Sequence, residues 1–206
     1  KMSTFVVISN NSFRNLKETD KIRMFIGSVI ELNDEEWSLL NNYIEIRHLK
    51  KNEFFLKEGN VCDSIAFINY GLFIYYKILD NADEKTTDFA VEGEWITNNH
   101  SRLNNSPSHL YIKAIEDSEV LIIKSKYLEY LYKRMPKLER FGRILIEQAF
   151  VKLVQLSIDL QILPAKERYE KLLKNYPAIF QRLPLYHIAN YLGIAPKSLS
   201  RIRNSF

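Results

Sequence analysis

The last 24 residues of the chain, LPLYHIANYLGIAPKSLSRIRNSF, have the spacing of two short helices that cross at a tight turn. Apolar residues three or four positions apart give each helix one side that can be buried. Gly193 between the helices tolerates a positive φ, and Pro196 suits the first turn of a helix, where a backbone N–H has no partner. We therefore predict a helix-turn-helix. Its packing residues are Ile188, Ala189, Leu192, Gly193, Leu199 and Ile202.

The second helix of this motif carries polar and basic residues on the side away from Leu199 and Ile202, where they can contact DNA phosphates and base edges. Charge supports this interpretation, because residues 164–206 contain eight Lys or Arg and two Asp or Glu, whereas the rest of the chain contains 21 and 23. The alternative is an ordinary helical hairpin with solvated charges. The candidate DNA-binding residues are Pro196, Lys197, Ser198, Arg201 and Arg203.

Composition excludes several other classes of protein. With 206 residues, 46% of them hydrophobic, the chain can bury a sizeable core, and we expect two domains. No apolar run approaches the ~20 residues that span a bilayer, and the sequence lacks a signal-type segment, so we expect a cytoplasmic protein with no membrane partner. The single cysteine, Cys62, cannot form an internal disulfide or hold an iron–sulfur cluster or zinc ion by itself.

Residues 44–124 form short β-type runs separated by Gly, Asn, Asp and Pro, which predict a sandwich, roll or barrel. The runs are EFFLK, IAFIN, GLFIYYKIL, KTTDFA, LYIKAI and EVLII. Residues 1–43 are predicted to be mostly helical, with a capping signal made by Asn33 and Glu36. A further helix is expected from Ser125 to Met135. The chain is therefore of the α+β class.

Residues 137–163 predict one long helix that is apolar on two sides. Such a helix needs two partners, and we expect one side to pack on the β domain and the other on a second copy of the chain. The alternative is a helix buried within one larger core. The stripe that we assign to the dimer helix is Leu138, Phe141, Leu145, Ala149, Leu153, Leu156 and Leu160, and the second set is Ile144, Ile146, Phe150, Val151, Val154 and Ile158.

Four segments of the chain resemble the Crp/Fnr family of bacterial transcription regulators: KKNEFFLKEGN, FINYGLFIYY, AKERYEKLL and HIANYLGIAPKSLSRIR. The resemblance implies a β-roll like that of cyclic-nucleotide-binding domains, of the double-stranded β-helix or jelly-roll type, over residues 1–135. The resemblance also implies a dimerisation helix over residues 136–163, and after it a winged helix-turn-helix DNA-binding domain over residues 164–206. It also implies a homodimer that binds a near-palindromic site in double-stranded DNA, with RNA polymerase as a further partner.

In that family the second helix of the motif enters the major groove, and its early residues contact bases. Arg201 could make paired hydrogen bonds to guanine, and Lys197 could contact guanine or phosphate. Ser198 and Arg203 are expected to contact phosphates. Pro196 and Lys197 stand where the best-known cyclic-AMP receptor has an arginine and then a glutamate, so the target sequence of that receptor does not carry over.

Cyclic-nucleotide-binding domains of that family hold the nucleotide with a sequence cassette in which Gly-Glu is followed, some residues later, by Arg-Ser. Gly93 and Glu94 are present, but residues 106–108 read Ser-Pro-Ser, and only Arg102, expected on a loop, could replace the missing arginine. Because an unpaired buried phosphate would cost several kcal/mol, we do not expect cyclic AMP to bind. The effector is another small molecule or none, and Glu94 alternatively is a solvated loop carboxylate. The candidate pocket residues are Gly93, Glu94, Trp95, Ser106 and Ser108.

Two other classes of function compete with a DNA-binding regulator. A cupin-like enzyme would need clustered His and carboxylate ligands, whereas the four histidines are scattered and expected at the surface or in loops. These are His48, His100, His109 and His187. We therefore expect no metal site, no catalytic residues and no enzyme. The remaining alternative is a small-molecule-binding β-roll that acts through a protein partner.

Overall fold

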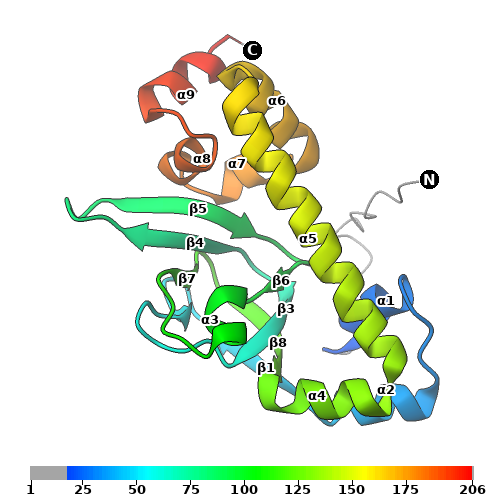
Figure 1. Ribbon diagram of the computed structural model, residues 1–206. Coiled ribbons are helices and arrows are strands. Elements are labelled where there is room, and N and C mark those ends of the chain that lie inside the picture. The colour runs from blue at the N-terminus through cyan, green and yellow to red at the C-terminus, as the bar shows by residue number, and fades with distance from the viewer. Residues whose placement is uncertain (1–17, 206) are drawn as a thin grey trace.

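Two antiparallel sheets form the centre of the molecule in the computed structural model, which describes residues 18–205. They lie in the lower left of Figure 1 and face each other across an apolar core that includes Ile68, Phe73, Ile112 and Val120. The first sheet has the order β1 (Ile44–Leu49), β8 (Ser118–Lys124), β3 (Ser64–Tyr70) and β6 (Trp95–Ile96). The second has the order β2 (Phe54–Leu56), β7 (Tyr111–Ala114), β4 (Phe73–Ile78) and β5 (Glu84–Ala90).

The turn from β3 to β4 requires glycine. Gly71 has a φ of +112°, and a Cβ atom built at this position would lie 2.0 Å from Oγ of Ser118. No side chain fits at that distance, and non-glycine residues avoid this φ. Gly71 therefore lets the chain pass from the first sheet to the second directly over the start of β8.

Three helices cover one end of the β-roll. They are α1 (Asp20–Gly27), α2 (Asp34–Asn41) and α4 (Ser125–Arg134), and they share an apolar cluster with Phe67 and Leu121 of the roll. The predicted capping signal at the start of α2 is confirmed, because Asn33 Oδ1 accepts from the Glu36 amide at 2.8 Å and Glu36 Oε2 accepts from the Asn33 amide at 2.9 Å.

One long helix, α5 (Pro136–Ile162), runs from this cluster to the C-terminal helices (Figure 1). These helices are α6 (Ala165–Asn175), α7 (Ile179–Arg182), α8 (Leu185–Tyr191) and α9 (Pro196–Arg203). At about 1.5 Å per residue, α5 extends ~40 Å. It therefore separates the three helices beside the roll from the C-terminal unit, which we define as residues 164–205.

The predicted β runs all form strands, and the predicted long helix begins one residue earlier than expected. The short helix α3 (Asn99–Asn104) was not predicted, and it carries Arg102, which we had expected on a loop. Part of the predicted N-terminal helical region lies outside the described residues. Residues 125–205 contain helices and no strand, so a wing after α9 stays a prediction.

Candidate nucleic-acid interface

The helix-turn-helix is formed by α8, a turn at Gly193 and α9. Gly193 has a φ of +66°, as the sequence predicted, and the Ile194 amide donates to the Ala189 carbonyl at 3.0 Å. A Cβ atom on Gly193 would lie 3.0 Å from Leu160 Cδ2 on α5, so the long helix closes over this turn. The turn therefore needs glycine for its backbone conformation and also for its approach to α5.

The apolar residues of the motif pack against one another, as their spacing in the sequence predicted. Ile188, Ala189, Leu192 and Leu199 are buried in one cluster, and Ile202 is half-buried against it. Pro196 is the first residue of α9, where its missing N–H removes no helical hydrogen bond. The second helix is thereby held against the first through its apolar stripe.

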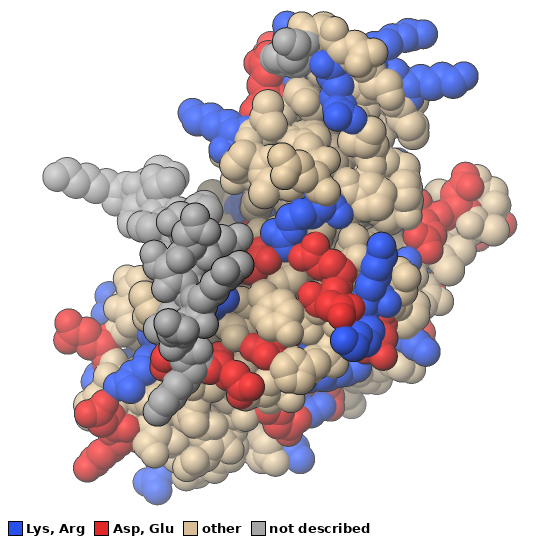
Figure 2. Space-filling view, turned by 180° about the vertical axis from the view of Figure 1, so that it is seen from behind, with Lys and Arg blue, Asp and Glu red and all other residues tan. Residues whose placement is uncertain are grey.

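The opposite side of α9 is basic and open. Lys197, Arg201 and Arg203 are exposed, Ser198 is half-buried, and within residues 18–205 none of the three cations forms an ion pair. Figure 2 shows Lys and Arg side chains projecting from the end of the molecule that holds the C-terminal helices, at the top of the view. These cations are available to contact phosphate or base edges.

The C-terminal unit does not stand apart from the β-roll, because α8 packs on β5 through a shared apolar cluster. The ring of Phe89 lies edge-on to Tyr176 and Tyr191, with ring centres 4.9 Å apart in each pair. The buried roll residues of this cluster are Leu72, Ile74, Tyr76, Phe89 and Ile115, and those of the C-terminal unit are Tyr169, Leu172, Ile179, Leu183, Ile188, Ala189, Leu192 and Leu199.

Two polar contacts fix α8 on the same sheet. Thr86 Oγ1 lies 2.6 Å from His187 Nδ1, and Asn190 Nδ2 donates to the Glu84 carbonyl at 3.1 Å. Burial, and then the charge of Lys113, lower the pKa of His187 to about 4, so the imidazole is neutral at pH 7. Our expectation that His187 lies at the surface or in a loop is wrong, because α8 turns it toward β5.

Arg182 of α7 forms a second connection to the roll. Its Nη1 donates to Glu92 Oε2 at 2.9 Å and its Nη2 to Glu92 Oε1 at 2.7 Å, and Nη2 also binds Glu116. Burial opposes the charge of Arg182, but the hydrogen bonds that it donates to the two carboxylates raise its pKa. A two-pronged guanidinium–carboxylate pair fixes orientation as well as distance. Arg182 therefore sets the angle at which α7 meets the turns after β5 and β7.

Glu94 connects three parts of the molecule. Its Oε1 accepts from Tyr176 Oη at 2.9 Å and from Lys152 Nζ at 3.3 Å, and its Oε2 accepts from the Val91 amide at 3.0 Å. It thereby joins the roll to α5 and to the segment after α6. The Glu94 side chain lies in the turn before β6 and is 29% exposed, but both of its oxygens accept hydrogen bonds from within the chain.

Comparison with known families matches residues 46–135 to the cyclic nucleotide-binding domain. The transcriptional activator protein Anr of Pseudomonas protegens is 26% identical over 189 residues, which are 86% of this chain and 77% of Anr. FixK2 of Bradyrhizobium japonicum superposes with a TM-score of 0.67 at 17% identity, covering 79% of this chain and 83% of FixK2. A structure described under the Crp/Fnr family, from Eubacterium rectale, superposes with a TM-score of 0.63 at 18% identity, covering 85% and 83%.

Over most of its length the chain is thus similar to transcription regulators of the Crp/Fnr type. The resemblance in the sequence is thus confirmed, as is the expected fold of a β-roll, a long helix and C-terminal helices. The relatives named here are regulators of transcription or share their fold. None of the helices in the described part of the chain is long and apolar enough to cross a membrane.

The candidate pocket residues form contacts within the chain. Ser108 Oγ accepts from Asn98 Nδ2 at 2.8 Å and donates to the Leu110 carbonyl at 2.8 Å. Trp95 packs between Phe25, Phe67 and Phe141. The candidate pocket residues thus divide, with Gly93, Glu94 and Trp95 on the side of α5 and Ser106 and Ser108 after α3.

The long helix α5 exposes apolar side chains from Ile146 to its end. Leu138 and Phe141 are buried among α1, α2 and α4 of the same chain, so the start of this stripe packs within the chain. Leu145 and Leu156 are half-buried, and Ala149 is exposed. The exposed apolar residues are Ile146, Phe150, Val151, Leu153, Val154, Ile158, Leu160 and Ile162.

Proposed function

We propose that this regulator acts as a homodimer in which each α9 enters the major groove of one half of a near-palindromic DNA site. The basic side of α9, whose cations form no ion pair within residues 18–205, carries the proposal, because it lies on a helix-turn-helix that packs through buried residues. A twofold dimer presents two such helices about one turn of DNA apart. DNA-binding residues are Pro196, Lys197, Ser198, Arg201 and Arg203, within a domain of residues 164–206.

Arg201 is the proposed base reader, since its guanidinium can donate two hydrogen bonds to guanine O6 and N7. Lys197, near the start of α9, contacts guanine or phosphate. Ser198 and Arg203 contact phosphates and set the orientation of the helix on the duplex. RNA polymerase is the expected further partner, and the protein acts in the cytoplasm, where that DNA lies.

The part of α5 from Ile146 to Ile162 supports the dimer. Eight apolar side chains are exposed there, and Phe150 is 65% accessible in the single chain. A matching helix from a second copy would bury them, as in a coiled coil. The dimer helix therefore comprises residues 136–163, and its contact face is the exposed set rather than the stripe that begins at Leu138.

The β-roll of residues 1–135 is the proposed sensory domain. Because α8 and α7 bind β5 and the turn after it, a change in the roll can alter the position of the DNA-binding helices. A ligand shifts such an equilibrium only by its difference in affinity for the two arrangements. Cyclic AMP is not the proposed effector, since the arginine of the cassette is absent and Ser108 already binds Asn98.

Selection from a random pool of duplex DNA tests this function. The full chain is mixed with the pool at low salt, and bound duplexes are recovered and sequenced over several rounds. The proposal expects enrichment of a site with two related halves. Recovery of a pool that remains random after selection would contradict it.

A further inference from the structure

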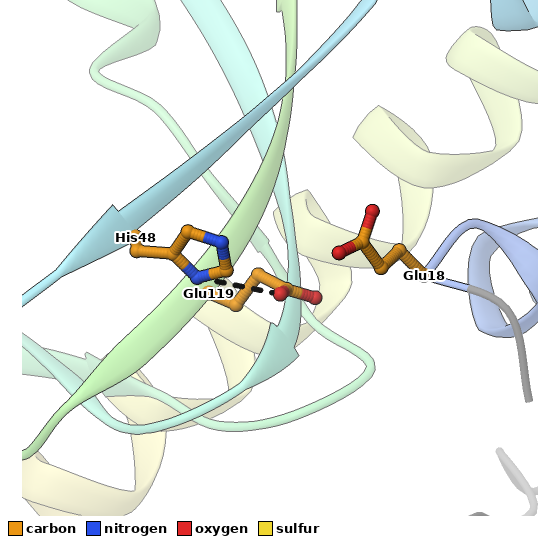
Figure 3. A group of neighbouring side chains, drawn as sticks. All are labelled: Glu18, His48 and Glu119. Carbon is orange, nitrogen blue, oxygen red and sulfur yellow. Dashed lines mark ion pairs between the residues drawn. The ribbon is translucent and has the colours of Figure 1, made fainter. Parts of the chain in front are cut away.

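Three side chains from distant parts of the sequence meet at one edge of the first sheet (Figure 3). Glu18 lies just before α1, His48 is on β1 and Glu119 is on β8. One ligand atom from each residue lies within 4.8 Å of the other two. An imidazole and two carboxylates are a ligand set that zinc accepts in proteins.

Sheet register fixes two of the three side chains. His48 and Glu119 are direct partners in the antiparallel pair of β1 and β8, so both side chains lie on one face. His48 Nδ1 and Glu119 Oε2 are 3.4 Å apart, which exceeds the usual length of a hydrogen bond, about 2.7–3.2 Å. Two ligands that are each about 2.1 Å from a tetrahedral ion lie about 3.4 Å apart. The spacing therefore fits two ligands of one ion.

The buried carboxylate is oriented by a neighbouring amide. Glu119 is only 5% exposed, and its Oε1 accepts from Asn69 Nδ2. The same Nδ2 donates to the backbone carbonyl of Glu18 at 2.9 Å, and Asn69 is 6% exposed. Metal-binding carboxylates are commonly held by outer partners of this kind. Asn69 therefore brings the segment before α1 and the Glu119 carboxylate to the same place.

Charge at this position favours a cation. Glu18 and Glu119 place two carboxylates within 4.8 Å of each other, and burial makes the charge of Glu119 costly unless it is balanced. Lys21 brings one positive charge nearby, with its Nζ donating to the Asn69 carbonyl at 2.9 Å. The formal charge of these three groups is still negative, so the position attracts a cation.

We propose that Glu18, His48 and Glu119 bind one Zn²⁺ ion, with water in the remaining position. The ion would tie the segment before α1 to strands β1 and β8 and so stabilise that end of the β-roll. Mg²⁺ and Ca²⁺ prefer sites made wholly of oxygen ligands, and the imidazole selects against them. No pattern in the sequence indicates the site, because its three ligands come together only through the sheet register and the packing of the segment before α1.

Calorimetric titration of the full chain with ZnCl₂, after removal of metal with a chelator, tests the site. We expect one Zn²⁺ per chain, and no comparable heat with MgCl₂. His48→Ala and Glu18→Gln each change an exposed side chain, so the variants should fold. Each should weaken Zn²⁺ binding at least tenfold, since loss of even an outer partner costs about 10–100-fold. His100→Ala, which removes an exposed histidine of α3, should bind Zn²⁺ as the wild type does.

Co²⁺ absorption gives a second measurement on the same proteins. A tetrahedral site gives visible bands that His48→Ala should abolish and His100→Ala should preserve. The proposal is overturned if the wild type binds no Zn²⁺, or if His48→Ala binds it unchanged. Equal weakening in the His48 and His100 variants would show adventitious binding at surface histidines and would also overturn it.

Discussion

Thr86 Oγ1 lies 2.6 Å from His187 Nδ1, and this contact joins strand β5 of the β-roll to the first helix of the helix-turn-helix. Both side chains are buried, and neighbouring contacts from Asn190 and Arg182 bind the same unit to the roll. The β-roll and the C-terminal unit thus share one continuous interface. Conditions that weaken the contact should therefore affect the stability of both parts.

Acid should weaken this interface through His187. Its pKa is about 4 in the folded chain, against 6.5 as its ordinary value, so the unfolded chain binds more protons between these limits. Stability from this group is therefore full above pH 6.5 and falls as pH is lowered toward 4, by up to about 3 kcal/mol. Urea unfolding of the wild type and His187→Gln at pH 7, 6, 5 and 4 should show their difference shrinking as pH falls.

The comparison with the variant is needed because Asp88 acts in the opposite sense. Burial raises the pKa of Asp88 to about 6, so its contribution favours the folded chain as pH falls between 6 and 3.8. His187→Gln retains Asp88, and the difference between the two proteins isolates the histidine. His100→Gln serves as the control for an exposed histidine. Parallel pH profiles for wild type and His187→Gln would show that the assigned titration is wrong.

Gly71→Ala should destabilise the β-roll. A methyl group there meets Ser118 Oγ at 2.0 Å, and the φ of +112° is one that alanine rarely adopts. Strain of this kind costs about 1–3 kcal/mol before the clash is added. Gly27→Ala is the matched control, since its Cβ would have no neighbour within 4 Å and it lies in a helix. Thermal unfolding should show a lower midpoint for Gly71→Ala alone, and equal midpoints would refute the argument.

Phe150→Glu should convert the proposed dimer to a monomer. Phe150 lies on the exposed apolar part of α5, where a second helix would have to bury an unpaired charge. Leu103→Glu makes the same change on α3 at an apolar residue that is 70% exposed, and it should leave assembly unchanged. Sedimentation velocity distinguishes the two states. A Phe150→Glu protein that sediments as the wild type does would place the contact elsewhere.

Arg201→Ala should weaken binding to the selected DNA site by roughly 5–150-fold, the equivalent of about 1–3 kcal/mol for a bidentate contact. Fold and assembly should not change, because the side chain is exposed and forms no ion pair within residues 18–205. Arg140→Ala provides the control, because it removes an exposed arginine from the end of α5 that lies away from the C-terminal unit. Fluorescence anisotropy with labelled duplex measures both. If Arg201→Ala binds the duplex with unchanged affinity, the proposed role of Arg201 in reading a base is wrong.

Local patterns were sufficient to predict the helix-turn-helix and most strands. These predictions depend only on neighbouring residues. Gly193 has the positive φ that the turn needs, and Pro196 begins α9. The strands of the roll likewise follow from short apolar runs between turn residues. The helix α3 could not be predicted, because it is six residues long and has no apolar stripe.

Contacts between distant residues could not be predicted in this way. Thr86 and His187 are 101 positions apart, and Arg182 and Glu92 are 90 apart, so neither pair leaves a periodic signal. For the same reason, the sequence showed that α5 is apolar on two sides but not which side the chain itself covers. Burial of Leu138 by the helices beside the roll decided that point.

Titration of the selected duplex with the full chain, at ionic strengths from low to moderate, tests the central claim most directly. The account predicts two chains per duplex and an affinity that falls linearly, on logarithmic axes, as salt rises, because bound phosphates release counterions. A duplex that carries one half-site should bind more weakly. If single chains bind the duplex, or if the affinity does not depend on salt, the claim that a dimer binds DNA through the basic side of α9 is contradicted.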